Sequence, residues 1–138
     1  MIIETFAYAR AGLLGNPSDG YFGKTISVVV RNFGARATIY HTPELVIEHH
    51  EPEENKFRNI YQFADSVRQQ GYYGSQRLIK AAIKSFYDYC ENNKIKLESK
   101  NFSIRCQSSI PRQVGLAGSS AMITAVFRAL MSFYNVEI

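Results

Sequence analysis

Two glycines and two serines stand close together between a strand pattern and a helix pattern, where they could bind phosphate. Residues 111–121 read Pro-Arg-Gln-Val-Gly-Leu-Ala-Gly-Ser-Ser-Ala, with a strand pattern over 102–106 before them and an apolar helix pattern over 121–134 after them. The first N–H groups of a helix lack intrahelical partners, the helix dipole makes this end positive, and glycine lets the backbone approach an anion closely. The segment is therefore a candidate phosphate-binding loop.

A plain structural explanation of these residues also exists, because serine is a common residue at the start of a helix, where it caps free N–H groups. The close spacing of Gly115, Gly118, Ser119 and Ser120 favours phosphate binding over capping alone.

Other glycine-containing loops fit the sequence less well. Gly23-Lys24-Thr25 resembles the end of a Walker A loop, but a strand pattern over 26–30 follows it, whereas a Walker A loop must open a helix. The dinucleotide fingerprint Gly-x-Gly-x-x-Gly does not occur. The Gly-x-x-Gly at 115–118 is shared with KH domains, where it joins two helices, but a strand pattern precedes it in this chain.

The elements around the loop predict an α+β fold. We predict strands over 6–14, 25–30, 35–40, 45–47 and 102–106, and those over 25–30 and 35–40 are rich in β-branched residues. We expect the first four to form a meander that carries residues 9–19 at its rim. Helical periodicity predicts helices over 57–70, 75–91 and 121–134. The expected architecture is a sheet covered by helices on one face.

The last predicted helix should be the buried central helix. Small residues recur along it at every fourth position, which suits close packing on a sheet: Ala121, Ala125 and Ala129. Its few polar residues fall in a single row: Thr124, Arg128 and Ser132.

The composition is that of an ordinary globular domain with a modest positive charge. The 138 residues carry a net charge of +4, and several cations lie in or beside the candidate segments: Arg10, Lys24, Arg31, Arg36 and Arg112. These cations suit an anionic nucleotide. We expect no nucleic-acid partner, because no basic run with interleaved exposed aromatics occurs. We expect no membrane partner, because no apolar run approaches the roughly 18 residues of a membrane span.

Cysteine and histidine usage predicts neither a disulfide nor a metal centre. Cys90 lies on a helix pattern and Cys106 on a strand pattern, so both are interpreted as small core residues. The first residues do not resemble a signal peptide, and we expect a cytoplasmic protein. His49 and His50 stand beside three glutamates and could bind a metal, but an exposed turn explains them better.

The loop resembles the nucleotide loop of the GHMP kinases, a family that includes galactokinase, homoserine kinase, mevalonate kinase and phosphomevalonate kinase. The longer form of that loop, found in several sugar kinases, is matched by Pro111, Gly115, Leu116, Ser119, Ser120 and Ala121. Ala117 replaces the usual second glycine, and Gly118 beside it is expected to compensate.

Residues 9–19 resemble a second family motif, Gly-Arg-x-x-Leu-x-Gly-Glu-His-x-Asp in galactokinase. Four residues fall in register with it: Arg10, Leu13, Gly15 and Asp19. Asn16-Pro17 replaces the Glu-His pair. Together the two segments are most similar to the glucuronokinase subfamily, and the resemblance covers nearly the whole chain but only the first part of a full family member.

The resemblance implies that residues 1–138 are the N-terminal ATP-binding domain of a GHMP kinase, with a ribosomal-protein-like two-layer βαβ fold. It implies a kinase of carbohydrate metabolism that transfers the ATP γ-phosphate to a sugar or sugar-acid hydroxyl, and we expect the anomeric one. The alternatives are another family substrate such as mevalonate or homoserine, a catalytically incomplete nucleotide-binding module, and a structural or nucleic-acid-binding domain of related fold. The family's later Asp and closing domain do not occur in the chain, so we expect it to need a missing C-terminal domain and to be inactive alone.

The resemblance also assigns residue roles. Arg10 would be catalytic, near the transferred phosphoryl group, and Asn16, Asp19 and Tyr21 would bind the acceptor. Ser120 would contact Mg2+, with Ser119 as a helix cap or second phosphate donor. ATP would bind at Pro111, Val114, Gly115, Leu116, Ala117, Gly118, Ser119, Ser120 and Ala121.

Overall fold

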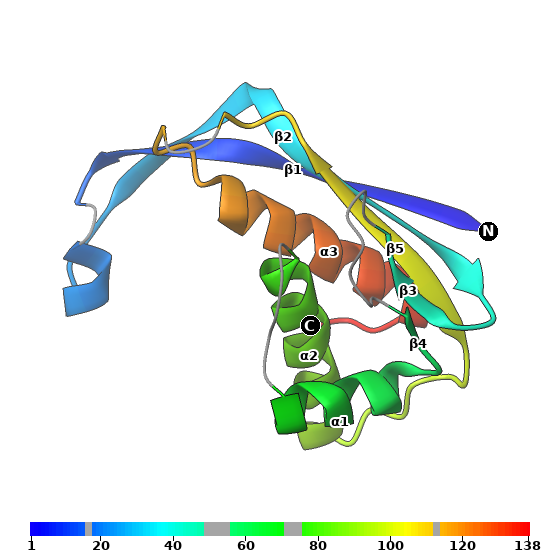
Figure 1. The fold of residues 1–138 in the computed structure, drawn as a ribbon. Helices are drawn as coiled ribbons and strands as arrows, with labels where there is room; N and C mark the ends of the chain where they lie inside the picture. Colours follow the sequence, from blue (N-terminus) through cyan, green and yellow to red (C-terminus); the bar gives the residue numbers. More distant parts are fainter. Residues whose placement is uncertain (16–17, 49–55, 71–75, 112–113) are drawn as a thin grey trace.

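The chain folds into a five-stranded sheet with its helices on one face (Figure 1), which confirms the predicted α+β fold. The structure is a computed structural model that describes residues 1–15, 18–48, 56–70, 76–111 and 114–138. In chain order its elements are β1 (Ile2–Leu14), the short 3-10 helix η1 (Ser18–Tyr21), β2 (Ile26–Thr42), β3 (Leu45–Ile47), β4 (Lys56–Phe57), α1 (Ile60–Gln70), α2 (Arg77–Asn92), β5 (Asn101–Ser108) and α3 (Gly118–Tyr134).

The strand order is β1-β2-β5-β3-β4, so the predicted meander is wrong. β5 lies between β2 and β3, antiparallel to β2 and parallel to β3. The physical reason is length: β2 offers a long edge that the three residues of β3 cannot cover, whereas β5 pairs with it from Ala35 to Thr42. In chain order, α1 and α2 come between β4 and β5, so the strand that pairs with β2 follows both helices.

The two strands predicted over 25–30 and 35–40 are one strand with an irregularity. Tyr8 pairs with Gly34 and the next residue, Ala9, pairs with Val30, so residues 31–33 are left out of the ladder. Gly34 is required at this point, because a Cβ there would lie 2.2 Å from the Phe6 ring.

The helix predicted from residue 57 begins at Ile60, because the residues before it form a cap. The Asn59 side chain accepts a hydrogen bond from the Gln62 N–H at 2.8 Å, and the Gln62 side chain accepts one from the Arg58 N–H at 2.5 Å. This reciprocal pattern resembles a capping box: it satisfies the Gln62 N–H, which the first turn leaves free, and the Arg58 N–H just before the helix. Residues 56–57 pair with β3 instead.

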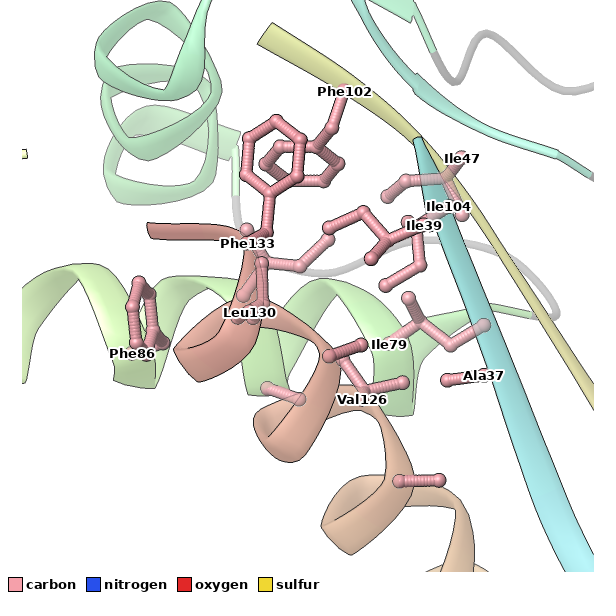
Figure 2. Packing of buried hydrophobic residues seen from close by; sticks show 14 of the residues in the cluster. Ala37, Ile39, Ile47, Ile79, Phe86, Phe102, Ile104, Val126, Leu130 and Phe133 are labelled. Carbon is pink, nitrogen blue, oxygen red and sulfur yellow. The ribbon is translucent and has the colours of Figure 1, made fainter. Parts of the chain in front are cut away.

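The core lies between the sheet and the helices, with α3 at its centre as predicted. α3 packs against β1, β2, β5 and α2, and its alanines at 121, 125 and 129 are buried. Figure 2 shows Phe133 of α3 against Phe102 of β5, with Val126 and Leu130 of the same helix among the buried side chains. The aromatic end of this core is held by edge contacts between Phe102 and Phe133, whose ring centres lie 5.6 Å apart.

The β1–β2 hairpin extends beyond this core and ends at η1 (Figure 1). We call residues 13–29 of this hairpin the arm. Nearly half of the large apolar side chains that are exposed in the described residues lie on it: Leu13, Leu14, Tyr21, Phe22, Ile26, Val28 and Val29. The arm therefore carries apolar surface that the core of this chain does not cover.

Both cysteines are free thiols, and the interpretation as core residues is confirmed for Cys90. Cys90 is buried, and Cys106 is half-buried against the core. Residues 49 and 50, weighed as metal ligands, lie outside the described residues. Within the described part, no helix is both long enough and apolar enough to cross a bilayer.

Burial raises the pKa of the Cys106 thiol to about 11, because burial disfavours the charged thiolate. In a Cys90→Ser background, alkylation of Cys106 at pH 8 should be roughly 100-fold slower in the folded chain than in urea, since only the thiolate reacts. The folded rate should keep rising with pH to about pH 11. Equal rates in the two states would contradict the burial of this thiol.

Candidate functional site

A cleft of about 260 Å3 brings together the two segments that the sequence singled out, although about 100 residues separate them. Its walls come from the end of β1, the start of β2 and the loop before α3: Arg10, Gly12, Leu14, Thr25, Ile26, Ser27, Gly115 and Ala117. The catalytic candidate, Arg10, thus lines the same cleft as two candidates of the nucleotide loop, Gly115 and Ala117.

A backbone hydrogen bond joins these two walls. The Arg10 N–H donates to the Leu116 carbonyl oxygen at 3.1 Å. β1 is the first strand of the described sheet, so this N–H lies on an edge with no neighbouring strand. The loop thus takes the place of a further strand at this position, and the spacing between Arg10 and the loop is fixed by main-chain atoms.

The loop makes its turn at Gly115 and Ala117. Gly115 has φ +75°, and Ala117 has φ 52° and ψ 40°, both in the left-handed region. Left-handed backbone is unfavourable for alanine because of its Cβ. The expectation that Gly118 compensates for Ala117 is wrong: Gly118 is the first residue of α3, and the alanine makes the turn itself.

α3 starts three residues before the predicted position, which places both serines in its first turn. The Ala121 N–H donates to the Ala117 carbonyl at 3.0 Å, so the N–H groups of residues 118–120 come before the first intrahelical bond. Ala117 is the N-cap residue and makes no side-chain cap bond, so serine capping does not explain this segment, and the suggested cap role of Ser119 is wrong. The side chains of Ser119 and Ser120 are exposed.

Arg10 supplies positive charge to the cleft. Its side chain is exposed, and among the side chains that the structure describes it has no carboxylate within ion-pair distance. Its guanidinium is therefore available to an anion in the cleft.

Two acceptor candidates, Asp19 and Tyr21, belong to η1 at the tip of the arm, and the structure does not bring Tyr21 into the cleft. Tyr21 ends η1 with 82% of its side chain exposed. Asp19 lies in η1, but its side chain, Asn16, and Arg112 of the loop lie outside what the structure describes. The tip is closed by the Gly23 N–H, which donates to the Ser18 carbonyl at 2.8 Å.

Sequence reasoning missed the contribution of β2 to the cleft. Thr25, Ile26 and Ser27 line it because β1 and β2 pair as a hairpin, with Gly12 opposite Ser27. The rejection of a Walker A loop at 23–25 is consistent with the structure, since β2 follows it. The sequence did offer a signal for this contribution. A strand over 25–30 that pairs with the strand of Arg10 lies next to any site that Arg10 forms.

Comparison with known proteins shows what this chain is similar to. Residues 77–138 match the family model described as GHMP kinases N terminal domain. The chain is 43% identical over 136 residues to Glucuronokinase 1 of Arabidopsis thaliana, covering 98% of this chain and 38% of that protein. The chain therefore spans well under half the length of this curated relative.

Solved structures show the same fold. A crystal structure of mevalonate kinase superposes with a TM-score of 0.75 at 21% identity, covering 99% of this chain and 42% of that one. The mevalonate kinase of Methanococcus jannaschii gives a TM-score of 0.73 at 24% identity, covering 100% and 41%. The two structures show the fold, and the family model and the Arabidopsis relative confirm the predicted resemblance to the GHMP kinases and to glucuronokinase.

Because the backbone of Ala117 is left-handed, we expect a glycine at this position to raise the stability of the fold. Ala117→Gly should raise the free energy of unfolding by about 0.5–1 kcal/mol, because the relief of strain exceeds the extra entropy of glycine in the unfolded chain. Gly115→Ala, where a Cβ meets no atom within 4 Å, should lower it by about 1 kcal/mol through backbone strain alone. Urea denaturation of both variants measures this, and a loss of stability in Ala117→Gly would contradict the assigned turn.

Proposed function

We propose that this chain is the N-terminal, nucleotide-binding part of a GHMP-family kinase that transfers the γ-phosphate of ATP to a hydroxyl of a sugar or sugar acid. The observation that carries the proposal is the cleft in which Arg10 and the loop at 115–117 face the same space. The glucuronokinase relative makes glucuronate the first acceptor to test, at its anomeric hydroxyl.

The loop and the first turn of α3 would hold the phosphates of ATP. Three N–H groups precede the first intrahelical bond there, and the helix dipole adds partial positive charge. Gly115 has open space around it, so the backbone can approach an anion closely. Phosphoryl transfer depends on positioning and charge neutralisation, and this end of α3 offers both.

The first turn of α3 also fits a magnesium ion bound together with the nucleotide. The exposed hydroxyl of Ser120 is a hard oxygen ligand, and Mg2+ takes few protein ligands because it keeps several waters and binds phosphate oxygens. When bound, Mg2+ would neutralise phosphate charge. Ser120 would orient the nucleotide through this ligand, and Ser119 would offer a second hydroxyl to the phosphates.

The acceptor would bind from the side of the arm. Arg10 would contact the transferring phosphoryl group, for which a guanidinium is suited because it stays charged and binds oxygens through a fixed fork. Asp19, with Asn16 and Tyr21, would bind sugar hydroxyls. Asn16-Pro17 in place of Glu-His removes a negative charge beside the acceptor, which favours an acidic sugar.

The nucleotide role of Ser120 is tested by titrating Mg·ATP against two serine variants of one helix row. Ser120→Ala should weaken binding by about tenfold, because a charge-assisted contact is worth about 1.5–3 kcal/mol. Ser132→Ala is the matched control, since Ser132 is exposed in the same row three turns further along α3. Equal affinities in the two variants would remove Ser120 from the site.

The acceptor role is tested by steady-state kinetics of the full-length protein with glucuronate. Asp19→Ala should raise the acceptor KM about tenfold or more with little change in the KM for ATP, because a site that loses a sugar-hydroxyl partner loses binding energy for that sugar alone. Arg10→Ala should mainly lower kcat, because its contact strengthens as phosphoryl charge develops. A rise in the KM for ATP alone in Asp19→Ala would show that the acceptor assignment is wrong.

A further inference from the structure

Three hydrogen bonds tie β1 to the loop and to α3. One is the bond from the Arg10 N–H to the Leu116 carbonyl. In the second, the Arg128 guanidinium donates to the Phe6 carbonyl at 2.8 Å. In the third, the Thr5 hydroxyl donates to the Ala125 carbonyl at 2.6 Å. Only the Arg128 bond comes from a charged side chain, and a charged donor makes the stronger kind of hydrogen bond.

The positions of these bonds fix the line of α3 along β1. Phe6 lies four residues before Arg10, about 13 Å along the strand. On the other side, Arg128 lies twelve residues after Leu116, and α3 carries it about 15 Å or more from the loop. Core packing and the Thr5 bond hold the middle of α3 on the sheet. The Arg128 bond adds a fixed point further along the helix, and together with the bond at the loop it restrains the direction in which α3 presents its first turn.

Arg128 also stands in the row that leads to the candidate metal contact. Ser120, Thr124, Arg128 and Ser132 are exposed and follow one another at every fourth residue. Because this row includes Arg128, the bond to Phe6 turns the same face of the helix toward the edge of β1. Ser120 begins this row, in the first turn of α3 directly after the loop.

We propose that Arg128 is a positioning residue for the phosphate-binding loop. It does not contact the nucleotide; by holding α3 on the Phe6 carbonyl, it keeps the loop bonded to Arg10 and keeps the first turn of α3, with Ser120, next to that loop. The effect on nucleotide affinity rests on the proposed function, whereas the effect on the bond between Arg10 and Leu116 does not.

The first test measures the bond directly, by amide hydrogen exchange in the 138-residue chain without nucleotide. Arg128→Ala should speed exchange of the Arg10 N–H about tenfold, because the loop it bonds to opens more often. The Glu48 N–H, which donates to the Ile104 carbonyl at 2.8 Å in another part of the sheet, should be unchanged. Unchanged exchange at Arg10, or equal acceleration at both amides, would overturn the proposal.

The second test measures the consequence for nucleotide binding. Arg128→Ala should weaken Mg·ATP binding about five- to tenfold, and Arg128→Lys should restore most of it, since lysine keeps a charged donor. Arg105→Ala is the control for lost charge, because Arg105 is an exposed arginine of β5, two strands away from β1. Equal weakening in the Arg105 and Arg128 alanine variants, or no rescue by lysine, would overturn the positioning role. Failure of the wild-type chain to bind Mg·ATP while Arg10 exchange responds to Arg128→Ala would instead count against the proposed function.

Discussion

The close approach of α3 to the β1–β2 hairpin is the constraint on which the rest of the structure depends. Alanine stands on both sides of this contact: the helix contributes its buried alanines at 121, 125 and 129, and the strands contribute Ala7, Ala9, Ala35 and Ala37. Small side chains let the helix axis lie near the sheet, so polar atoms of the two elements come within bonding distance. A larger side chain here would cost about 1–3 kcal/mol and would also lift the first turn of α3 away from the cleft.

This contact explains why the loop takes an unfavourable conformation. Between the end of β5 and the first turn of α3 the chain must cross to the free edge of β1, where the Leu116 carbonyl accepts the Arg10 N–H. The chain turns into α3 directly after this bond, and the turn falls on an alanine with positive φ. Strain at one residue is thus offset by the burial of a whole helix.

Local patterns of the sequence predicted the parts of this structure that local interactions decide. The strand before the loop, the buried helix after it and its small-residue row follow from periodicity, and they are confirmed by α3 and β5. The place of β5 between β2 and β3 was not predictable in this way, because strand order depends on which long edges remain free after folding. The start of α1 was missed for a different reason: the cap formed by Asn59 and Gln62 is readable in the sequence, but the apolar Phe57 before it was interpreted as helical.

The residues of the candidate site also differ in whether a local pattern of the sequence predicts them. The loop residues carry a recognisable motif, so Gly115 and Ala117 were expected, and both line the cleft. Thr25 and Ser27 have no motif of their own and reach the cleft only through hairpin pairing. The conformation of Ala117 and the bond from Arg128 depend on tertiary geometry, which no spacing along the chain encodes.

The arm has a consequence for how this chain behaves in solution. It gathers exposed apolar side chains on a projecting hairpin, while a net charge of only +4 provides weak repulsion between copies. Apolar association strengthens on warming because it is driven by the entropy of water, and added salt screens the repulsion that opposes it. We therefore expect cold, dilute, low-salt buffers to keep the 138-residue chain dispersed, and we expect the projecting arm to contribute strongly to its association.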